Sequence, residues 1–207
     1  MSASTETPGN TSLTAFSASE PGSPAQRDRR RRIIRATIAL ASKGGYDAVQ
    51  MREVAERADV ALGTLYRYFP SKIHLLVSSL AAEFERAQDR TDRGHIPGDT
   101  PRDRVLHVLG RTTRSLQRDP NLTEAMTRAF MFADTTAAAE VDAVGNLMEQ
   151  MLTTAMSGNE ESTEEQRSVA RVIGDVWLSN LVAWVTRRSS ATDVANRLEL
   201  AVRLLLR

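Results

Sequence analysis

The chain has 207 residues, of which 41% are hydrophobic and none is cysteine. This length supports one or two domains with a substantial core, and the lack of cysteine excludes disulfides and thiolate metal sites. No apolar run approaches the roughly eighteen residues of a membrane span, and the N-terminus lacks the basic start and apolar core of a signal peptide. We therefore expect a cytoplasmic, globular protein that has no membrane partner.

Positive charge is concentrated in one part of the chain, although the net charge is only +1. Residues 1–26 carry a charge of −2, residues 27–90 carry +5 and residues 91–207 carry −2. A polyanionic partner favours a basic segment of this kind, but many ordinary domains are equally basic. Charge alone therefore indicates nucleic-acid binding only weakly.

The first segment, residues 1–26, consists mostly of Ser, Thr, Ala, Pro and Gly. Such a composition cannot bury enough apolar surface to offset the entropy lost on ordering. We predict a disordered tail, and a passive leader is favoured over a regulatory segment.

A helix is expected from Arg27, with apolar residues at helical spacing and an end at Gly44-Gly45. Six of its first nine residues are arginines, which oppose the helix dipole and so do not serve stability. They form either a solvated basic face or, beside a DNA-reading motif, a set of contacts to phosphates or the minor groove. The candidates for these contacts are Arg27, Arg29, Arg30 and Arg31.

The stretch MREVAERADVALGTLYRYFPSK, residues 51–72, predicts two short amphipathic helices joined by a tight turn. Apolar residues recur at spacings of three and four in both halves, and Pro70 ends the second helix. This is a helix-turn-helix pattern, whose second helix suits entry into a major groove. The apolar positions are Val54, Ala55, Ala58, Leu62, Leu65, Tyr66 and Phe69.

The run GGYDAVQMREVAERADVALGTLYRYFPSKIHLL resembles the DNA-binding domain of the TetR family of transcriptional repressors, and the resemblance covers about residues 27–85. The chain departs from the family at Gln50, Asp59 and Ala61, where Thr, Gly and Ser are usual. Gln50 and Ala61 are weak helix caps, so phosphate contacts by their side chains are in doubt. Asp59 is tolerated in a turn because Asp adopts the left-handed conformation more readily than most residues.

The resemblance implies DNA contacts from the second short helix and from the start of the helix after it. Arg67 can bind guanine through two hydrogen bonds, and Thr64 is small enough to touch a base edge. Tyr66 and Tyr68 can donate to phosphates, although we expect one of the two to serve mainly in packing. The full set is Leu62, Gly63, Thr64, Tyr66, Arg67, Tyr68 and Lys72.

The rest of the chain predicts further helices and no strand, which gives an all-α fold of about nine helices. We place the helix-turn-helix domain at residues 27–73 and a helical effector-binding and dimerisation domain at residues 74–207. The starts of the later helices are expected at Ser71, Thr100, Asp134 or Thr135, Ser162 and Ser190 or Thr192. A further short segment, rich in methionine and phenylalanine, is expected over 122–132.

An enzyme is not indicated, because the three histidines are scattered and no metal or nucleophile motif is present. We predict no catalytic residue, no metal and no cofactor. A different class, a helical protein–protein adaptor without DNA binding, stays open.

In the second domain, methionines and aromatic residues suit a pocket for a bulky apolar effector, although core packing is the default interpretation of each residue at helical spacing. The resemblance implies that such an effector releases the repressor from DNA, and that the last two helices form a homodimer. The candidates are Met126, Phe130, Met131, Met148, Met151, Trp177 and Leu181, with Arg111, Arg114 and Arg118 as contacts to a phosphate-bearing ligand or as a solvated face.

Within the family, the arginine-rich start is similar to that of actinobacterial repressors of sterol catabolism. This similarity implies a steroid-acid coenzyme A thioester as the effector and a double-stranded palindromic operator as the DNA partner. Regulation of fatty-acid metabolism or drug efflux is the alternative.

Overall fold

The computed structural model describes residues 23–92, 95–158 and 160–206. Within these ranges it contains nine α-helices, one short 3-10 helix and no strand, which confirms the predicted all-α fold. The predicted disordered tail lies outside the described residues, except for residues 23–26.

The first helix, α1 (Pro24–Ala48), begins three residues before the predicted start at Arg27. Ser23 and Gln26 form a capping box, in which each side chain accepts a hydrogen bond from the backbone of the other residue. Ser23 and Gln26 were predicted to lie in the disordered tail, so the predicted boundary was a few residues too late. At the other end, Gly44 and Gly45 leave helical geometry, and Gly45 has a φ of 69°, which confirms the predicted break.

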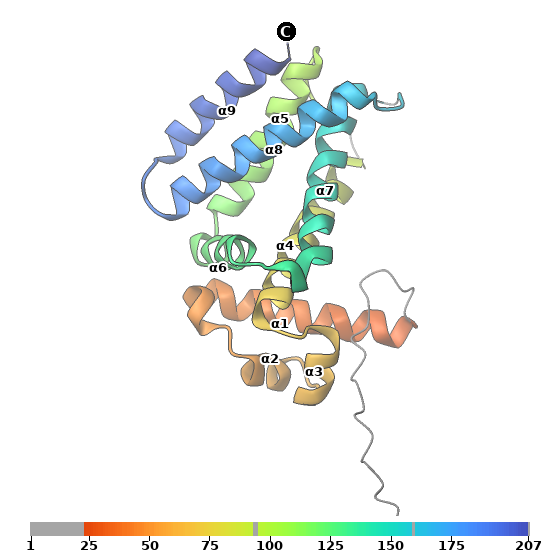
Figure 1. Ribbon diagram of the computed structural model, residues 1–207, viewed down its shortest axis with the longest axis vertical. Helices are drawn as coiled ribbons and strands as arrows, with labels where there is room; N and C mark the ends of the chain where they lie inside the picture. The colour runs from red at the N-terminus through yellow and green to blue at the C-terminus, as the bar shows by residue number, and fades with distance from the viewer. Residues whose placement is uncertain (1–22, 93–94, 159, 207) are drawn as a thin grey trace, which may run out of the picture.

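The two short helices of the motif are α2 (Met51–Arg57) and α3 (Leu62–Tyr68). Neither Gln50 nor Ala61 makes a side-chain capping bond, as their residue types predict. The turn between the helices depends on Asp59, whose φ is 53°. In Figure 1, α2 and α3 lie at one end of the molecule, below α1.

The remaining helices form the body. They are α4 (Lys72–Asp92), α5 (Pro101–Gln117), α6 (Pro120–Met131), the 3-10 helix Thr135–Ala137, α7 (Ala138–Ser157), α8 (Glu164–Val185) and α9 (Ala191–Leu205). Figure 1 shows α6 lying across α1, while α8 and α9 run side by side at the end of the molecule far from α3.

Side-chain caps define most of these helix starts. Thr100 and Ser190 cap α5 and α9 as predicted, and Asp134 caps the 3-10 helix. The cap of α8 is Thr163, one residue after the predicted Ser162, because Gln166 rather than Glu165 completes its capping box.

Candidate nucleic-acid interface and effector pocket

The outward face of α3 carries most of the predicted DNA contacts. Gly63, Tyr66 and Arg67 are exposed, and Leu62, Thr64 and Tyr68 are half-buried. The inward positions, Leu65 and Phe69, are buried as predicted. This division follows from helical spacing, because residues three and four apart share a face.

The two tyrosines of α3 have different surroundings. Tyr66 is 45% exposed, whereas the Tyr68 ring lies 6.4 Å from the ring of buried Phe69, measured between centroids. The surroundings of Tyr68 suit the packing role predicted for one of the two tyrosines, and Tyr66 is the more exposed of the pair.

The arginines of α1 divide into two groups. The Arg30 guanidinium lies 5.5 Å from the centroid of the Phe69 ring, so this side chain joins α1 to the end of α3. Arg32, which was not selected from the sequence, donates to the Ala58 carbonyl at 3.1 Å and lies 3.7 Å from the Asp59 carboxylate. Arg27, Arg29 and Arg31 remain as candidates along the first turns of α1.

Helices α1 to α3 form the head of the molecule, and Lys72 begins α4, the first helix of the body. Lys72 therefore lies at the junction between head and body. Its ammonium lies 3.9 Å from the centroid of the Tyr46 ring. Partial burial lowers the pKa of Lys72, and Asp47 opposes this shift. A phosphate contact by Lys72 would therefore compete with its cation–π contact to Tyr46.

Residues of α6 also contact Tyr46. The Arg128 guanidinium lies 4.4 Å from the Tyr46 centroid, and the Tyr46 backbone N–H donates to Glu124 at 3.1 Å. Asn121 also donates to the Ser42 carbonyl at 3.1 Å. We define Tyr46, Lys72, Glu124 and Arg128 as the junction cluster.

The salt dependence of DNA binding tests the basic side chains of α1. We expect Arg29→Ala and Arg31→Ala to weaken binding to all sequences alike, because phosphate contacts carry no sequence information. Each lost contact reduces the slope of log affinity against log salt by about 0.9. Gel shifts at several salt concentrations measure this slope, with Lys43→Ala at the opposite end of α1 as a charge-matched control. Unchanged slopes in both arginine variants would contradict phosphate contact.

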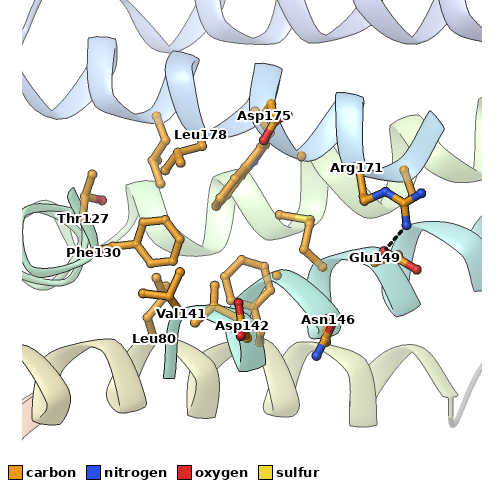
Figure 2. Close-up of a pocket in the computed structure, with 18 residues that line it drawn as sticks. Leu80, Thr127, Phe130, Val141, Asp142, Asn146, Glu149, Arg171, Asp175 and Leu178 are labelled. Atoms are coloured by element: carbon orange, nitrogen blue, oxygen red, sulfur yellow. Dashed lines mark hydrogen bonds and ion pairs between the residues drawn. The ribbon is translucent and has the colours of Figure 1, made fainter. Parts of the chain in front are cut away.

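A pocket of about 360 Å³ opens in the body between α4, α6, α7 and α8. Its volume falls within the range of pockets for drug-sized ligands, about 300–1,000 Å³. Figure 2 shows Phe130, Val141 and Leu178 converging on this space from three helices. The lining includes Phe84 and Trp177, whose rings meet edge to face with centroids 5.7 Å apart.

Four of the seven predicted ligand-binding residues line this pocket: Phe130, Met148, Trp177 and Leu181. Met126 is instead fully buried in the core, and Met131 is 54% exposed. The reason is helical phase, because Thr127 and Phe130 form the pocket face of α6 and their neighbours point elsewhere.

Met151 also lies away from the pocket. It is buried one turn beyond Met148 on α7, where its sulfur accepts a hydrogen bond from the Thr112 hydroxyl at 3.7 Å. Met126, Met131 and Met151 therefore do not line this pocket, because thioethers fill core gaps as readily as they line pockets.

The open rim of the pocket is acidic, a feature that sequence reasoning missed. It carries Asp142, Glu149 and Asp175, and its one basic residue, Arg171, pairs with Glu149 at 3.2 Å. Figure 2 shows this pair at one end of the pocket. Acidic residues on two separate helices look like ordinary solvated faces in a sequence, so no local signal marks them.

Among the described residues, no group of three or more His, Asp or Glu side chains is arranged to hold a metal ion. No helix in the ranges described is long and apolar enough to cross a membrane.

Two family models match the chain. The model "Bacterial regulatory proteins, tetR family" matches residues 33–78, and "Tetracyclin repressor-like, C-terminal domain" matches residues 98–205. The first includes the helix-turn-helix, and the second spans most of the body.

Curated relatives match over most of the chain. The HTH-type transcriptional repressor KstR of Mycolicibacterium smegmatis is 64% identical over 196 residues, which cover 95% of this chain and 96% of the relative. KstR of Rhodococcus jostii is 68% identical over 184 residues, which cover 89% of this chain and 85% of the relative.

Solved structures show the same fold. A TetR transcriptional regulator from Rhodococcus sp. RHA1 is 35% identical, with a TM-score of 0.79 over 89% of this chain and 98% of that structure. FadR of Thermus thermophilus, solved in complex with lauroyl-CoA, is 24% identical, with a TM-score of 0.63 over 86% of this chain and 93% of that structure. The latter likeness concerns the fold alone.

Proposed function

Because this chain belongs to the TetR family of bacterial transcriptional regulators, we propose that it is a ligand-responsive repressor that binds a palindromic operator in the cytoplasm as a homodimer. The observation that carries the proposal is the double role of α6. Thr127 and Phe130 on this helix line the pocket, while Glu124 and Arg128 hold Tyr46 beside the DNA-binding helices. A ligand that moves α6 therefore acts on the head directly.

The two α3 helices of a dimer would enter successive major grooves, with Arg67 and Thr64 toward base edges and Tyr66 toward phosphate. Exposed apolar residues on the two last helices support the dimer. Val172, Leu200 and Leu204 are 47%, 56% and 60% exposed, and a second copy would remove them from water.

The effector we propose is a steroid-acid coenzyme A thioester, and the regulated genes are those of sterol catabolism. High identity to the KstR repressors over most of the chain supports this choice, as does the apolar lining of the pocket. FadR, whose fold is similar, was solved with an acyl-CoA, so a long-chain acyl thioester is the competing effector.

The effector acts in this proposal by population shift. It binds a body arrangement in which α6 has moved, and the heads then leave the spacing that the operator requires. A gel-shift titration against salt separates this function from that of a protein–protein adaptor. A repressor loses operator affinity steeply as salt rises, whereas an adaptor shows no shift at any salt concentration.

Gly145 offers a test of the pocket that leaves the fold intact. It lies in α7 on the pocket wall, and a Cβ added there meets nothing within 4 Å. Gly145→Leu should stabilise the helix by about 0.5–1 kcal/mol and yet fill the space that an effector needs. We expect a repressor that binds its operator normally and no longer responds to effector.

Gly145→Ala is the matched control, because it restores helix propensity but adds only one methyl group. Thermal unfolding and effector titration of the operator complex measure both variants. Normal release of the Gly145→Leu repressor would rule out this pocket as the effector site.

A further inference from the structure

His74 is a buried polar side chain that belongs neither to the DNA-binding face of α3 nor to the lining of the apolar pocket. It is 7% exposed and lies in the first turn of α4. Phe69, Pro70 and Ser71 separate α3 from α4, and Figure 1 shows α4 starting beside α3 and passing α1 into the body. A shift of the first turn of α4 therefore moves α3 as well.

Both ring nitrogens of His74 have hydrogen-bond partners. Nε2 lies 2.9 Å from the carbonyl oxygen of Thr136 in the 3-10 helix, 62 residues along the chain. A carbonyl oxygen only accepts, so Nε2 carries the proton in this bond. Nδ1 lies 2.9 Å from the Ser71 hydroxyl, and in the neutral ring it accepts the proton of that hydroxyl. The imidazole thus bridges the 3-10 helix to the turn between α3 and α4.

The Thr136 end of this bridge lies between two helices that line the apolar pocket. Phe130 near the end of α6 and Val141 in the first turn of α7 both face the pocket, and the 3-10 helix connects them. Asp134 holds this connection in place, because its carboxylate accepts from the Thr136 backbone N–H at 2.9 Å and from the Thr136 hydroxyl at 2.6 Å. A displacement of either pocket residue therefore reaches the Thr136 carbonyl.

The bridge differs from the junction cluster. That cluster attaches α6 to α1 through Tyr46, whereas His74 attaches the 3-10 helix to the start of α4. A head held at one point pivots about it, whereas a head held at two points has a fixed orientation. Both attachments are therefore needed for a change in the body to set the orientation of the head.

We propose that His74 is a positioning residue for effector release, and that its Nε2–H bond to the Thr136 carbonyl carries a displacement of the segment between α6 and α7 to the turn after α3. The imidazole contacts neither DNA nor effector in this role. The inference rests on the proposed function, because it concerns how the effector pocket and the DNA-binding head communicate. A merely structural histidine would change stability and leave that communication intact.

Three substitutions separate the roles of the two ring nitrogens. The amide nitrogen of glutamine reaches the place of Nε2, so His74→Gln keeps a donor to Thr136. Asparagine is shorter and reaches only the place of Nδ1, so His74→Asn loses that donor but keeps a polar group. His74→Leu removes both hydrogen bonds. The glutamine and asparagine variants are therefore matched in chemistry and differ in reach.

The readout is a coupling factor, which is the ratio of the operator dissociation constants measured by gel shift with and without saturating cholanoyl-coenzyme A, a steroid-acid thioester. Coupled sites commonly give a factor of about 5 to 150. We expect His74→Gln to keep most of the wild-type factor, and His74→Asn and His74→Leu to lose it. Operator affinity without thioester, and thioester affinity without DNA by calorimetry, should stay within about threefold of the wild type in all three variants.

Ser79→Ala is the control for the loss of a buried hydrogen bond on the same helix, because the Ser79 hydroxyl donates to the Leu75 carbonyl within α4. This variant should keep the full coupling factor. Melting temperatures show which variants are folded during the measurement. The comparison of His74→Gln with His74→Asn decides the matter even if His74→Leu is unstable.

Hydrogen exchange gives a second readout that needs no effector. Coupling between two sites is reciprocal, so operator DNA should slow the exchange of the amides of residues 135–137 in the wild type and in His74→Gln, and not in His74→Asn. If the thioester does not release the wild-type protein, this exchange pattern alone decides.

A normal coupling factor and normal protection in His74→Asn overturn the proposal and leave the repressor function standing. Equal losses in His74→Gln and His74→Asn overturn it as well, because the Nε2 donor then has no special role. A wild-type protein that binds no operator overturns the proposed function itself, and the coupling with it.

Discussion

Replacing Arg67 with alanine should weaken operator binding about 5- to 150-fold for each half-site, the cost of about 1–3 kcal/mol for a bidentate base contact. Arg67 is exposed on α3, next to Tyr66, and its planar guanidinium matches the two acceptors of guanine. The variant should also lose discrimination at one base pair of each half-site. A mutation of that base pair should reduce the operator affinity of the wild-type protein strongly and that of the Arg67→Ala variant weakly.

Gel shifts at fixed salt with the operator and with single-base variants measure this effect. Arg102→Ala removes the same charge outside the DNA-binding helices and should leave affinity and specificity unchanged. Tyr66→Phe should weaken binding to all DNA sequences alike, because a phosphate contact carries no sequence information. If both Arg67→Ala and Tyr66→Phe leave affinity unchanged, α3 does not read DNA in the manner proposed.

Replacing Tyr46 with alanine should destabilise the protein by about 3 kcal/mol, since it removes a half-buried ring and two cation–π contacts. The ring lies 3.9 Å from the Lys72 ammonium and 4.4 Å from the Arg128 guanidinium. The junction cluster joins α6 to α1 and α4, so its loss should also uncouple the pocket from the head. The effector should then bind with little change in operator affinity.

Tyr46→Phe keeps the ring and is the matched control, expected to lie within about 0.5 kcal/mol of the wild type. Urea unfolding gives the stability difference, and effector titration of the operator complex gives the coupling. An effector response of normal size in Tyr46→Ala would show that the signal travels by another route.

The head could be predicted almost completely because its pattern is local. The spacing of Leu65 and Phe69 identifies their buried side, and Asp59 marks the turn that the backbone adopts at a φ of 53°. The weakness of Gln50 and Ala61 as caps also follows from residue type alone.

The junction and the pocket could not be predicted in the same way, since they depend on contacts between distant segments. Glu124 meets the Tyr46 backbone across 78 residues, and nothing near either residue indicates the other. Met126 and Met148 have the same chemistry, but only Met148 lines the pocket, because helical phase decides which one faces the space.

Footprinting on DNA that flanks the gene for this protein, with steroid-acid coenzyme A thioesters and long-chain acyl thioesters added in turn, tests the central claim most directly. We predict protection of a palindrome over successive major grooves, and loss of that protection with the steroid thioester at lower concentration than with any acyl thioester. Protection that no thioester reverses, or no protected palindrome at all, would contradict the account.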